Sequence, residues 1–196
     1  MKIFESLDKV SNEEMESKIL KKWKSEDILN KTIENRKNSK NFVFYDGPIY
    51  ANAKPGIHHV FAKTIKDSIC KYRTMKGNRV LRKIGLDTHG LPIEVNVEKK
   101  LGFKSKADIE KFGIENFCKE CNKETATNID IVKKVTDQMG QFIDMENPYI
   151  TCSNEFIESE WWLIKNIFDQ GLIYHGNKVL PYCPRCGTEL SANEVS

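Results

Sequence analysis

A strand, a turn and a helix are predicted for the stretch FYDGPIYANAKPGIHHVFAKTIKD, residues 44–67. The first residues are aromatic, Pro55-Gly56 marks a turn, and helical spacing follows from about His59. Two adjacent histidines, His58 and His59, stand where that helix would begin. A helix N-terminus after a strand offers unpaired N–H groups that bind phosphate, and a histidine there adds another donor. Taken alone, histidines at such a position are more often simple helix caps or surface residues, and a phosphate site is the functional alternative.

The nearby lysines and the spacing of the two histidines favour a phosphate site over a metal site. Lys54, Lys63 and Lys66 place positive charge near the predicted helix start, as stabilisation of a transferring phosphate requires. Zinc is disfavoured there, because helical metal-ligand pairs usually sit three or four residues apart. A phosphate site remains the main functional prediction.

The rest of the chain alternates predicted helices and strands. Charged helical sequence fills residues 12–40, and NFVFYD, residues 41–46, reads as a short buried strand. A helix carrying Phe61, Ile65, Ile69 and Tyr72 comes next, followed by a strand within MKGNRVLRKIG and a loop at LDTHGLPIE between Gly85 and Pro92. Mostly helical sequence covers 92–135, and a further helix is predicted over 154–171. The segment LIYHGNKVLPYC is predicted to form a strand, a turn and a strand. Strands alternating with helices at this spacing predict an α/β fold with a parallel sheet.

Composition fits an ordinary globular chain of about one domain. The 196 residues are 39% hydrophobic and 30% charged, with a net charge of +3 that is compatible with an RNA partner without requiring one. The basic segments KILKKWKSED and ENRKNSKN could touch RNA or form a solvated helix face. No apolar run approaches the roughly 18 residues of a membrane helix, and MKIFESLDKVSNEEMESK lacks an apolar signal core. We expect a cytoplasmic protein without a membrane partner.

Four of the six cysteines stand in two pairs with metal-ligand spacing. Cys183 and Cys186 form a C-x-x-C knuckle, which is half of a tetrahedral zinc site. Cys118 and Cys121 repeat the spacing within a predicted helix, so a four-cysteine site is an alternative. Without a signal sequence, metal ligands or structural thiols are expected before disulfides.

The order of motifs resembles the class I aminoacyl-tRNA synthetases, and more narrowly the isoleucyl-tRNA synthetases. DGPIYANAKPGIHHVFAKTIKD is followed about twenty residues later by GLDTHGLPIE, and residues 147–195 resemble the isoleucyl family nearly throughout. The resemblance covers about residues 3–195. It implies an N-terminal helical segment over 1–40, the first half of a Rossmann-like catalytic domain over 41–180, and the start of a zinc-knuckle or editing insertion over 181–196.

The resemblance also implies an activity and its ligands. The family uses ATP with Mg²⁺ to convert isoleucine to isoleucyl-adenylate, and then transfers the acyl group to tRNA-Ile. The second half of the catalytic sheet is absent from these 196 residues, so we expect an N-terminal fragment with little activity alone, which a second polypeptide could complete. A non-catalytic nucleotide- or RNA-binding module, or a remnant, is the alternative.

The family's ATP signature, His-x-Gly-His, falls on Gly56, Ile57, His58 and His59. The second histidine of the signature is His59. The first is replaced by Gly56, and the glycine by His58, so the two residues are exchanged. The resemblance implies that all four positions bind ATP and that His58 and His59 carry the catalytic contacts, with His58 supplying from a new position what Gly56 cannot.

Three residues are implied in amino-acid binding. Asp87 matches the aspartate that receives the substrate's ammonium, Pro48 matches a residue that packs on the isoleucine side chain, and His89 shapes the same loop. A turn-forming role for Asp87 and a structural role for His89 are the alternatives. The family usually has proline at Ile49 and tryptophan at Leu86. In the family, a downstream cysteine pair completes a zinc site with the pair matching Cys183 and Cys186, so Zn²⁺ is also implied.

Overall fold

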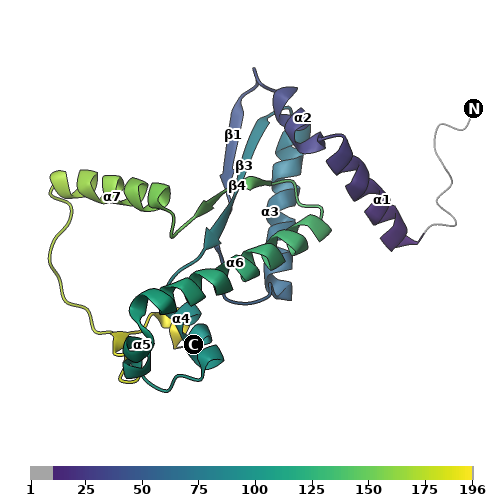
Figure 1. Ribbon diagram of the computed structural model, residues 1–196. Coiled ribbons are helices and arrows are strands. Elements are labelled where there is room, and N and C mark those ends of the chain that lie inside the picture. The colour runs from purple at the N-terminus through teal and green to yellow at the C-terminus, as the bar shows by residue number, and fades with distance from the viewer. Residues whose placement is uncertain (1–10, 196) are drawn as a thin grey trace, which may run out of the picture. The chain divides into compact units, whose positions relative to one another are not determined.

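A computed structural model describes residues 11–195 of the chain (Figure 1). Its helices are α1 (Asn12–Ser25), α2 (Ile28–Glu34), α3 (Ile57–Met75), α4 (Leu91–Leu101), α5 (Lys106–Phe112), α6 (Ile114–Gln138), α7 (Asn154–Asp169) and the 3-10 turn η1 (Ala192–Glu194). Its strands are β1 (Asn41–Tyr45), β2 (Ile49–Tyr50), β3 (Arg79–Asp87), β4 (Asp144–Ile150), β5 (Tyr182–Cys183) and β6 (Thr188–Glu189).

The chain divides into two compact units, which are described separately. The first unit contains the described residues up to 47, with 55–84 and 132–148, and the second contains 48–54, 85–131 and 149–195. The strands β3 and β4 each run from the first unit into the second. The residues of the predicted ATP signature lie in the first unit, and Pro48, Asp87 and His89 lie in the second.

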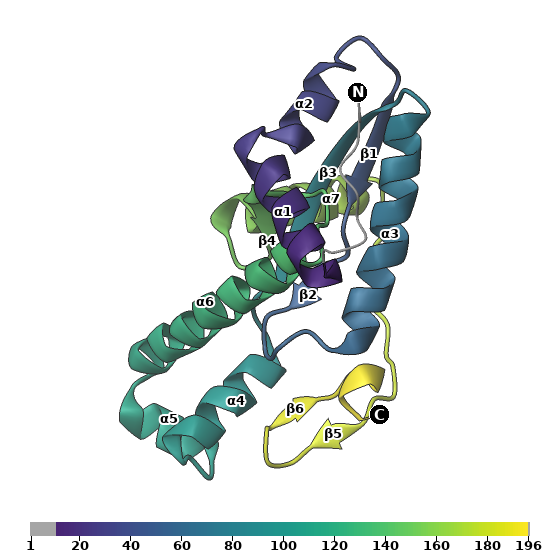
Figure 2. The ribbon, with the colours of Figure 1, turned by 90° about the vertical axis from the view of Figure 1, so that its right-hand side faces the viewer.

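Parallel pairing organises the main sheet, as the sequence predicts. In the first unit β1 pairs in parallel with β3, with Asn41 opposite Arg79 and Tyr45 opposite Lys83. In the second unit β2 pairs in parallel with the last residues of β3. The strand order is β1–β3–β2, and β4 also pairs with β3. Figure 2 shows the separate antiparallel hairpin of β5 and β6, followed by η1.

The helix α3 buries polar residues and exposes apolar ones. Its buried residues are Lys63, Asp67, Cys70 and Thr74. Its exposed large apolar residues are Ile57, Phe61, Ile65, Ile69, Tyr72 and Met75. The sequence correctly predicts a helix that carries Phe61, Ile65, Ile69 and Tyr72, but these apolar side chains are exposed. Within the described residues, α3 is therefore held to β1 and β3 mainly by polar contacts.

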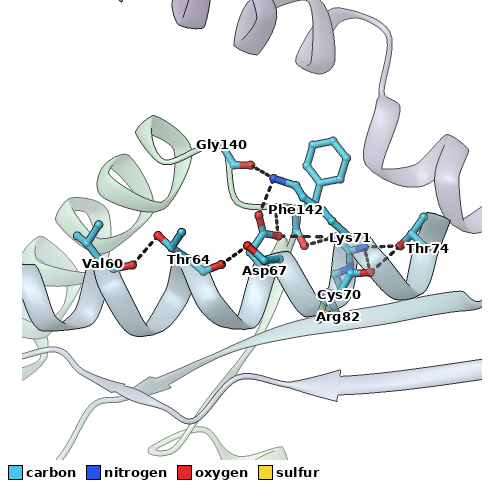
Figure 3. Close-up of polar contacts among 10 residues, drawn as sticks. Val60, Thr64, Asp67, Cys70, Lys71, Thr74, Arg82, Gly140 and Phe142 are labelled. Atoms are coloured by element: carbon cyan, nitrogen blue, oxygen red, sulfur yellow. Dashed lines mark hydrogen bonds and ion pairs between the residues drawn. The ribbon is translucent and has the colours of Figure 1, made fainter. Parts of the chain in front are cut away.

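One buried polar cluster joins α3 to β3 and to the segment that precedes β4 (Figure 3). The Arg82 guanidinium donates to the carbonyls of Phe142, at 2.9 Å, and Cys70, at 3.1 Å. Asp67 accepts from the Phe142 N–H at 3.1 Å and pairs with Lys71, whose ammonium also donates to the Gly140 carbonyl at 3.0 Å. Because Arg82 is only 5% exposed, its several partners offset the cost of burying its charge.

Replacing Arg82 with methionine is expected to lower the free energy of unfolding by about 3 kcal/mol, because the buried acceptors lose their donor. Urea denaturation of the chain measures this loss. Arg73→Met is the matched control, since Arg73 is an exposed arginine on α3, and it should cost less than about 1 kcal/mol. Equal losses for the two variants would contradict a structural role for the cluster.

Several local predictions from the sequence are confirmed and others are wrong. The helices over 12–34, 57–75 and 154–169 are present, and Ser153 caps α7 by accepting from the Phe156 N–H. The strand at 41–46 is present but is not buried, because Val43 and Tyr45 are 56% and 62% exposed. The predicted strand–turn–strand over 172–183 contains no strand before Tyr182, and the predicted loop at LDTHGLPIE shrinks to 88–90 because β3 and α4 extend into it.

Among residues 11–195, no helix is both long and apolar enough to cross a membrane.

Candidate active site

The start of α3 fixes the orientation of His59. The Gly56 N–H donates to Nδ1 of His59 at 3.0 Å, and the His59 N–H donates to the Gly56 carbonyl at 3.0 Å. A ring nitrogen that accepts a hydrogen bond carries no proton, so the proton of the neutral ring lies on Nε2. Partial burial, then the neighbouring His58 and Lys63, lower the pKa of His59. His59 therefore presents a neutral N–H donor at a helix N-terminus.

His58 lies over the position that a side chain at residue 56 would occupy. A Cβ on Gly56 would come within 2.8 Å of Cε1 and 3.0 Å of Nδ1 of His58. The rings of His58 and His59 are also in contact, with centroids 3.9 Å apart. The glycine at 56 thus makes room for the histidine at 58, and the two residues depend on each other sterically.

Not all of the lysines near the start of α3 are available to bind a ligand. Lys63 and Lys66 both bind the Asp46 carboxylate, at 2.7 and 2.8 Å. Lys54 is exposed. Of the three lysines that the sequence places near the phosphate site, two are therefore engaged by a carboxylate at the end of β1.

In the second unit, the Thr151 hydroxyl joins Asp87, Thr88 and His89. It accepts from the Thr88 N–H at 3.1 Å, donates to Oδ1 of Asp87 at 3.3 Å, and lies 3.1 Å from Nδ1 of His89. Because one hydroxyl proton cannot serve two acceptors, a Thr151 that donates to Asp87 requires His89 to donate from Nδ1. The half-buried Asp87 carboxylate is thereby oriented at the end of β3.

Tyr50 supports the same loop from β2. Its hydroxyl donates to the His89 carbonyl at 2.6 Å. Burial, followed by the charge of Asp87, raises the pKa of Tyr50 to about 12. A Cβ on Gly90 would approach the Tyr50 hydroxyl to 2.9 Å, and Gly90 has a φ of +104°, so both space and backbone conformation favour glycine there. Sequence reasoning identifies neither Tyr50 nor Thr151 as a site residue, because each acts through a partner distant in sequence.

The two departures from the family's amino-acid pocket turn out to be neighbours. Ile49 lies opposite Leu86 in the parallel pairing of β2 with β3, and both side chains are buried, at 7% and 1% exposure. Pro48, immediately before Ile49, is exposed. Changes at positions 49 and 86 therefore affect one cross-strand contact.

The cysteines do not assemble as one four-ligand group. Within residues 11–195, no cluster of three or more His, Cys, Asp or Glu side chains is placed to hold a metal, so the alternative of a four-cysteine site at Cys118, Cys121, Cys183 and Cys186 is not formed. Cys183 and Cys186 nevertheless adopt a knuckle, in which the Cys186 N–H donates to Sγ of Cys183 at 3.4 Å. That bond lowers the pKa of the Cys183 thiol.

The parallel sheet, together with a helix that begins at a Gly/His turn after the first strand, is the arrangement of a class I synthetase catalytic fold. Residues 18–196 match the family described as class I tRNA synthetases (I, L, M and V), and the chain belongs to that family. A crystal structure of a ternary complex, Agrobacterium radiobacter K84 agnB2 LeuRS-tRNA-LeuAMS, has the same fold. The TM-score is 0.66 at 22% identity, over 92% of this chain and 21% of that one.

Similar proteins come from several bacteria. The Isoleucine--tRNA ligase of Clostridium kluyveri is 50% identical over 183 residues, which are 93% of this chain and 18% of the relative. The Isoleucine--tRNA ligase of Dehalococcoides mccartyi (strain CBDB1) is 48% identical over 183 residues, with the same coverage. The Isoleucine--tRNA ligase 2 of Bacillus cereus is 45% identical over 181 residues, covering 92% of this chain and 18% of the relative. The chain thus spans about a fifth of these relatives, and the comparisons do not favour the alternative of a non-catalytic module.

Proposed function

We propose that this chain is the part of an isoleucine–tRNA ligase that binds ATP and isoleucine for the first step of the reaction. The observation that carries the proposal is the 45–50% identity to relatives named as isoleucine–tRNA ligases over nearly the whole chain. In that step the isoleucine carboxylate attacks the α-phosphate of ATP, and the bond to the leaving pyrophosphate breaks. The protein contributes positioning and charge stabilisation.

The ATP end of the proposed site is the start of α3. Gly56, Ile57, His58 and His59 form the N-terminal turn of α3, and the N–H groups at the start of a helix favour an anion. His59 would donate from Nε2 to a phosphate oxygen, and His58 would donate from the place left open by Gly56. His58 and His59 would therefore be the catalytic contacts to ATP.

Exchanging residues 56 and 58 tests this division of roles. Gly56→His alone should crowd the His58 ring, and His58→Gly alone should remove the His58 donor, so each should raise the KM for ATP about tenfold, as loss of one hydrogen bond to a charged group does. The double variant Gly56→His/His58→Gly should recover most of the affinity, because it restores one histidine beside one glycine.

The measurement is the KM for ATP of the parent, the two single variants and the double variant, each made in the chimera described at the end of this subsection. His175→Gly is a matched control at an exposed histidine. Losses that simply add in the double variant would contradict the coupling of positions 56 and 58.

The amino-acid end is proposed at Asp87, with Pro48 and His89. A half-buried carboxylate pairs with an ammonium group through charge-assisted hydrogen bonds. Thr151 would keep one Asp87 oxygen occupied and leave the other for the substrate. Pro48 would contact the isoleucine side chain.

Metal ions enter the proposal in two ways. Mg²⁺ would accompany ATP as part of the substrate. Cys183 and Cys186 fit half of a zinc site, since both thiols lie in one knuckle with an N–H···S bond, and Zn²⁺ would hold the β5–β6 hairpin in its fold. The remaining zinc ligands would come from outside residues 11–195.

We further propose that the apolar faces of this chain are covered by other parts of the catalytic fold, in the same polypeptide or a second one. Phe61 on α3 is 67% exposed, and Trp161 and Trp162 on α7 are 66% and 64% exposed. Apolar surface of this extent marks an interface.

tRNA-Ile would be the final acyl acceptor, which implies a cytoplasmic location.

The experiment is a chimera in which residues 1–196 replace the matching part of the Clostridium kluyveri relative. Isoleucine-dependent exchange of labelled pyrophosphate into ATP should approach the rate of the intact relative. The 196-residue chain alone should show exchange that is lower by orders of magnitude. A folded chimera without exchange would overturn the proposal, and full exchange by the chain alone would overturn the need for further parts.

A further inference from the structure

The first turns of α3 bury no apolar side chain fully. Ile57 and Phe61, the large apolar residues of these turns, are 84% and 67% exposed, and Val60 is half-buried. The buried residue at this level is Lys63, which is 5% exposed and lies one turn after His59. The most deeply buried side chain of these turns is therefore a charged one.

The partner of Lys63 is Asp46, which directly follows β1. Asp46 is 1% exposed, and its two carboxylate oxygens bind Nζ of Lys63 at 2.7 Å and Nζ of Lys66 at 2.8 Å. The Asp46 N–H donates to the Lys83 carbonyl at 2.9 Å, so the backbone of Asp46 is fixed to β3. The carboxylate thus joins a rigid point of the sheet to the first turns of the helix.

We propose that Asp46 and Lys63 are positioning residues for the proposed ATP end, whose buried ion pair holds the start of α3, and with it the His59 ring, to the end of β1. Burial opposes ionisation of Asp46, but the hydrogen bonds and charges of Lys63 and Lys66 outweigh it and lower the pKa of that carboxyl. Asp46 is therefore charged at neutral pH, and a buried Lys63 without it would be an uncompensated charge.

The remainder of α3 has its own attachment. Asp67, Cys70 and Thr74 contact Arg82 or the segment at Phe142, as Figure 3 shows. Loss of the Asp46–Lys63 pair should therefore loosen the first turns and leave the last turns in place. Lys66 provides a comparison on the same carboxylate, because its side chain is 39% exposed whereas that of Lys63 is 6% exposed.

Amide hydrogen exchange of the 196-residue chain tests this localisation. Asp46→Asn and Lys63→Met should each speed exchange of amides 60–66 about tenfold or more, with amides 70–75 changed less than about threefold. Lys66→Met should have a small effect, because the exposed ammonium contributes little. Asp46→Asn/Lys63→Met should recover part of the protection, because neither residue then leaves an unpaired buried charge.

The ring of His59 gives a second readout that general loosening of the fold would not produce. In the parent chain, NMR of the His59 ring should show a proton on Nε2 only, because Nδ1 accepts from Gly56. Asp46→Asn should mix the two tautomers, and Asp46→Glu, which keeps the charge, should retain more of the parent signature. Should Asp46→Asn fail to fold, Asp46→Glu and Lys63→Met carry the same test.

Two results would overturn the proposal: faster exchange spread evenly along α3, or unchanged exchange at 60–66 with an unchanged His59 tautomer. The relevance to ATP rests on the proposed function, and it is measured separately. Added ATP should slow exchange of amides 57–60 in the parent chain. Absence of that protection would contradict the ATP end, while the exchange data without ATP would still decide the role of Asp46 and Lys63.

Discussion

Replacing His59 with alanine is expected to slow isoleucine-dependent exchange by about 100- to 1,000-fold, the usual effect of removing one donor aimed at developing charge. His59 is held for this role, because its Nδ1 accepts from Gly56 at 3.0 Å and its Nε2 is left to donate. Partial burial and the nearby charges lower the pKa of His59, so the ring remains a neutral donor at pH 7. The measurement is the exchange rate of the chimera at saturating ATP and isoleucine.

The control for His59→Ala is His175→Ala, since His175 is exposed and lies outside the helices and strands. His175→Ala should leave the rate within about twofold, as surface changes usually do. If His59→Ala reduced the rate only by the same small factor, α3 would not be the catalytic phosphate site.

Replacing Asp87 with asparagine is expected to raise the KM for isoleucine about 100-fold or more, as removal of one partner of a close charge pair does. Asparagine keeps the size of the side chain and can still accept from Thr151, so the loop should remain folded. The KM for ATP should change little, because the loss concerns the substrate ammonium alone. The two KM values are measured in the same exchange assay.

Asp130→Asn is the matched control, since Asp130 is exposed on α6 in the same unit. Parallel increases in both KM values for Asp87→Asn would indicate a damaged fold. An unchanged KM for isoleucine would assign Asp87 to the turn-forming role that the sequence leaves open.

Local features of the sequence predict much of the fold. Gly56 before a helical pattern predicts the start of α3, and Ser153 and Gly171 bracket α7 through a cap and a positive φ. The parallel sheet follows from strands separated by helices, and pairing of β1 with β3 confirms it. These features depend on residues that lie close together in the sequence, so the sequence alone predicts them.

Features that depend on distant partners are not predictable in this way. The sequence places Lys63 as positive charge near a phosphate site, yet Asp46, seventeen residues earlier, binds it. Thr151 joins Asp87 and His89 across more than sixty residues. The apolar residues of α3 predict a helix, but the buried face is the polar one, because Arg82 and Asp46 supply partners that the periodicity cannot indicate.

The choice of amino acid in pyrophosphate exchange shows whether this chain belongs to an enzyme specific for isoleucine. The family includes synthetases for I, L, M and V, so the chimera should be assayed with isoleucine, leucine, methionine and valine separately. We predict the highest kcat/KM with isoleucine, a lower value with the smaller valine, and negligible exchange with leucine and methionine. A folded chimera that prefers leucine or methionine, or that exchanges pyrophosphate with none of the four, would overturn the proposal that this chain is part of an isoleucine–tRNA ligase.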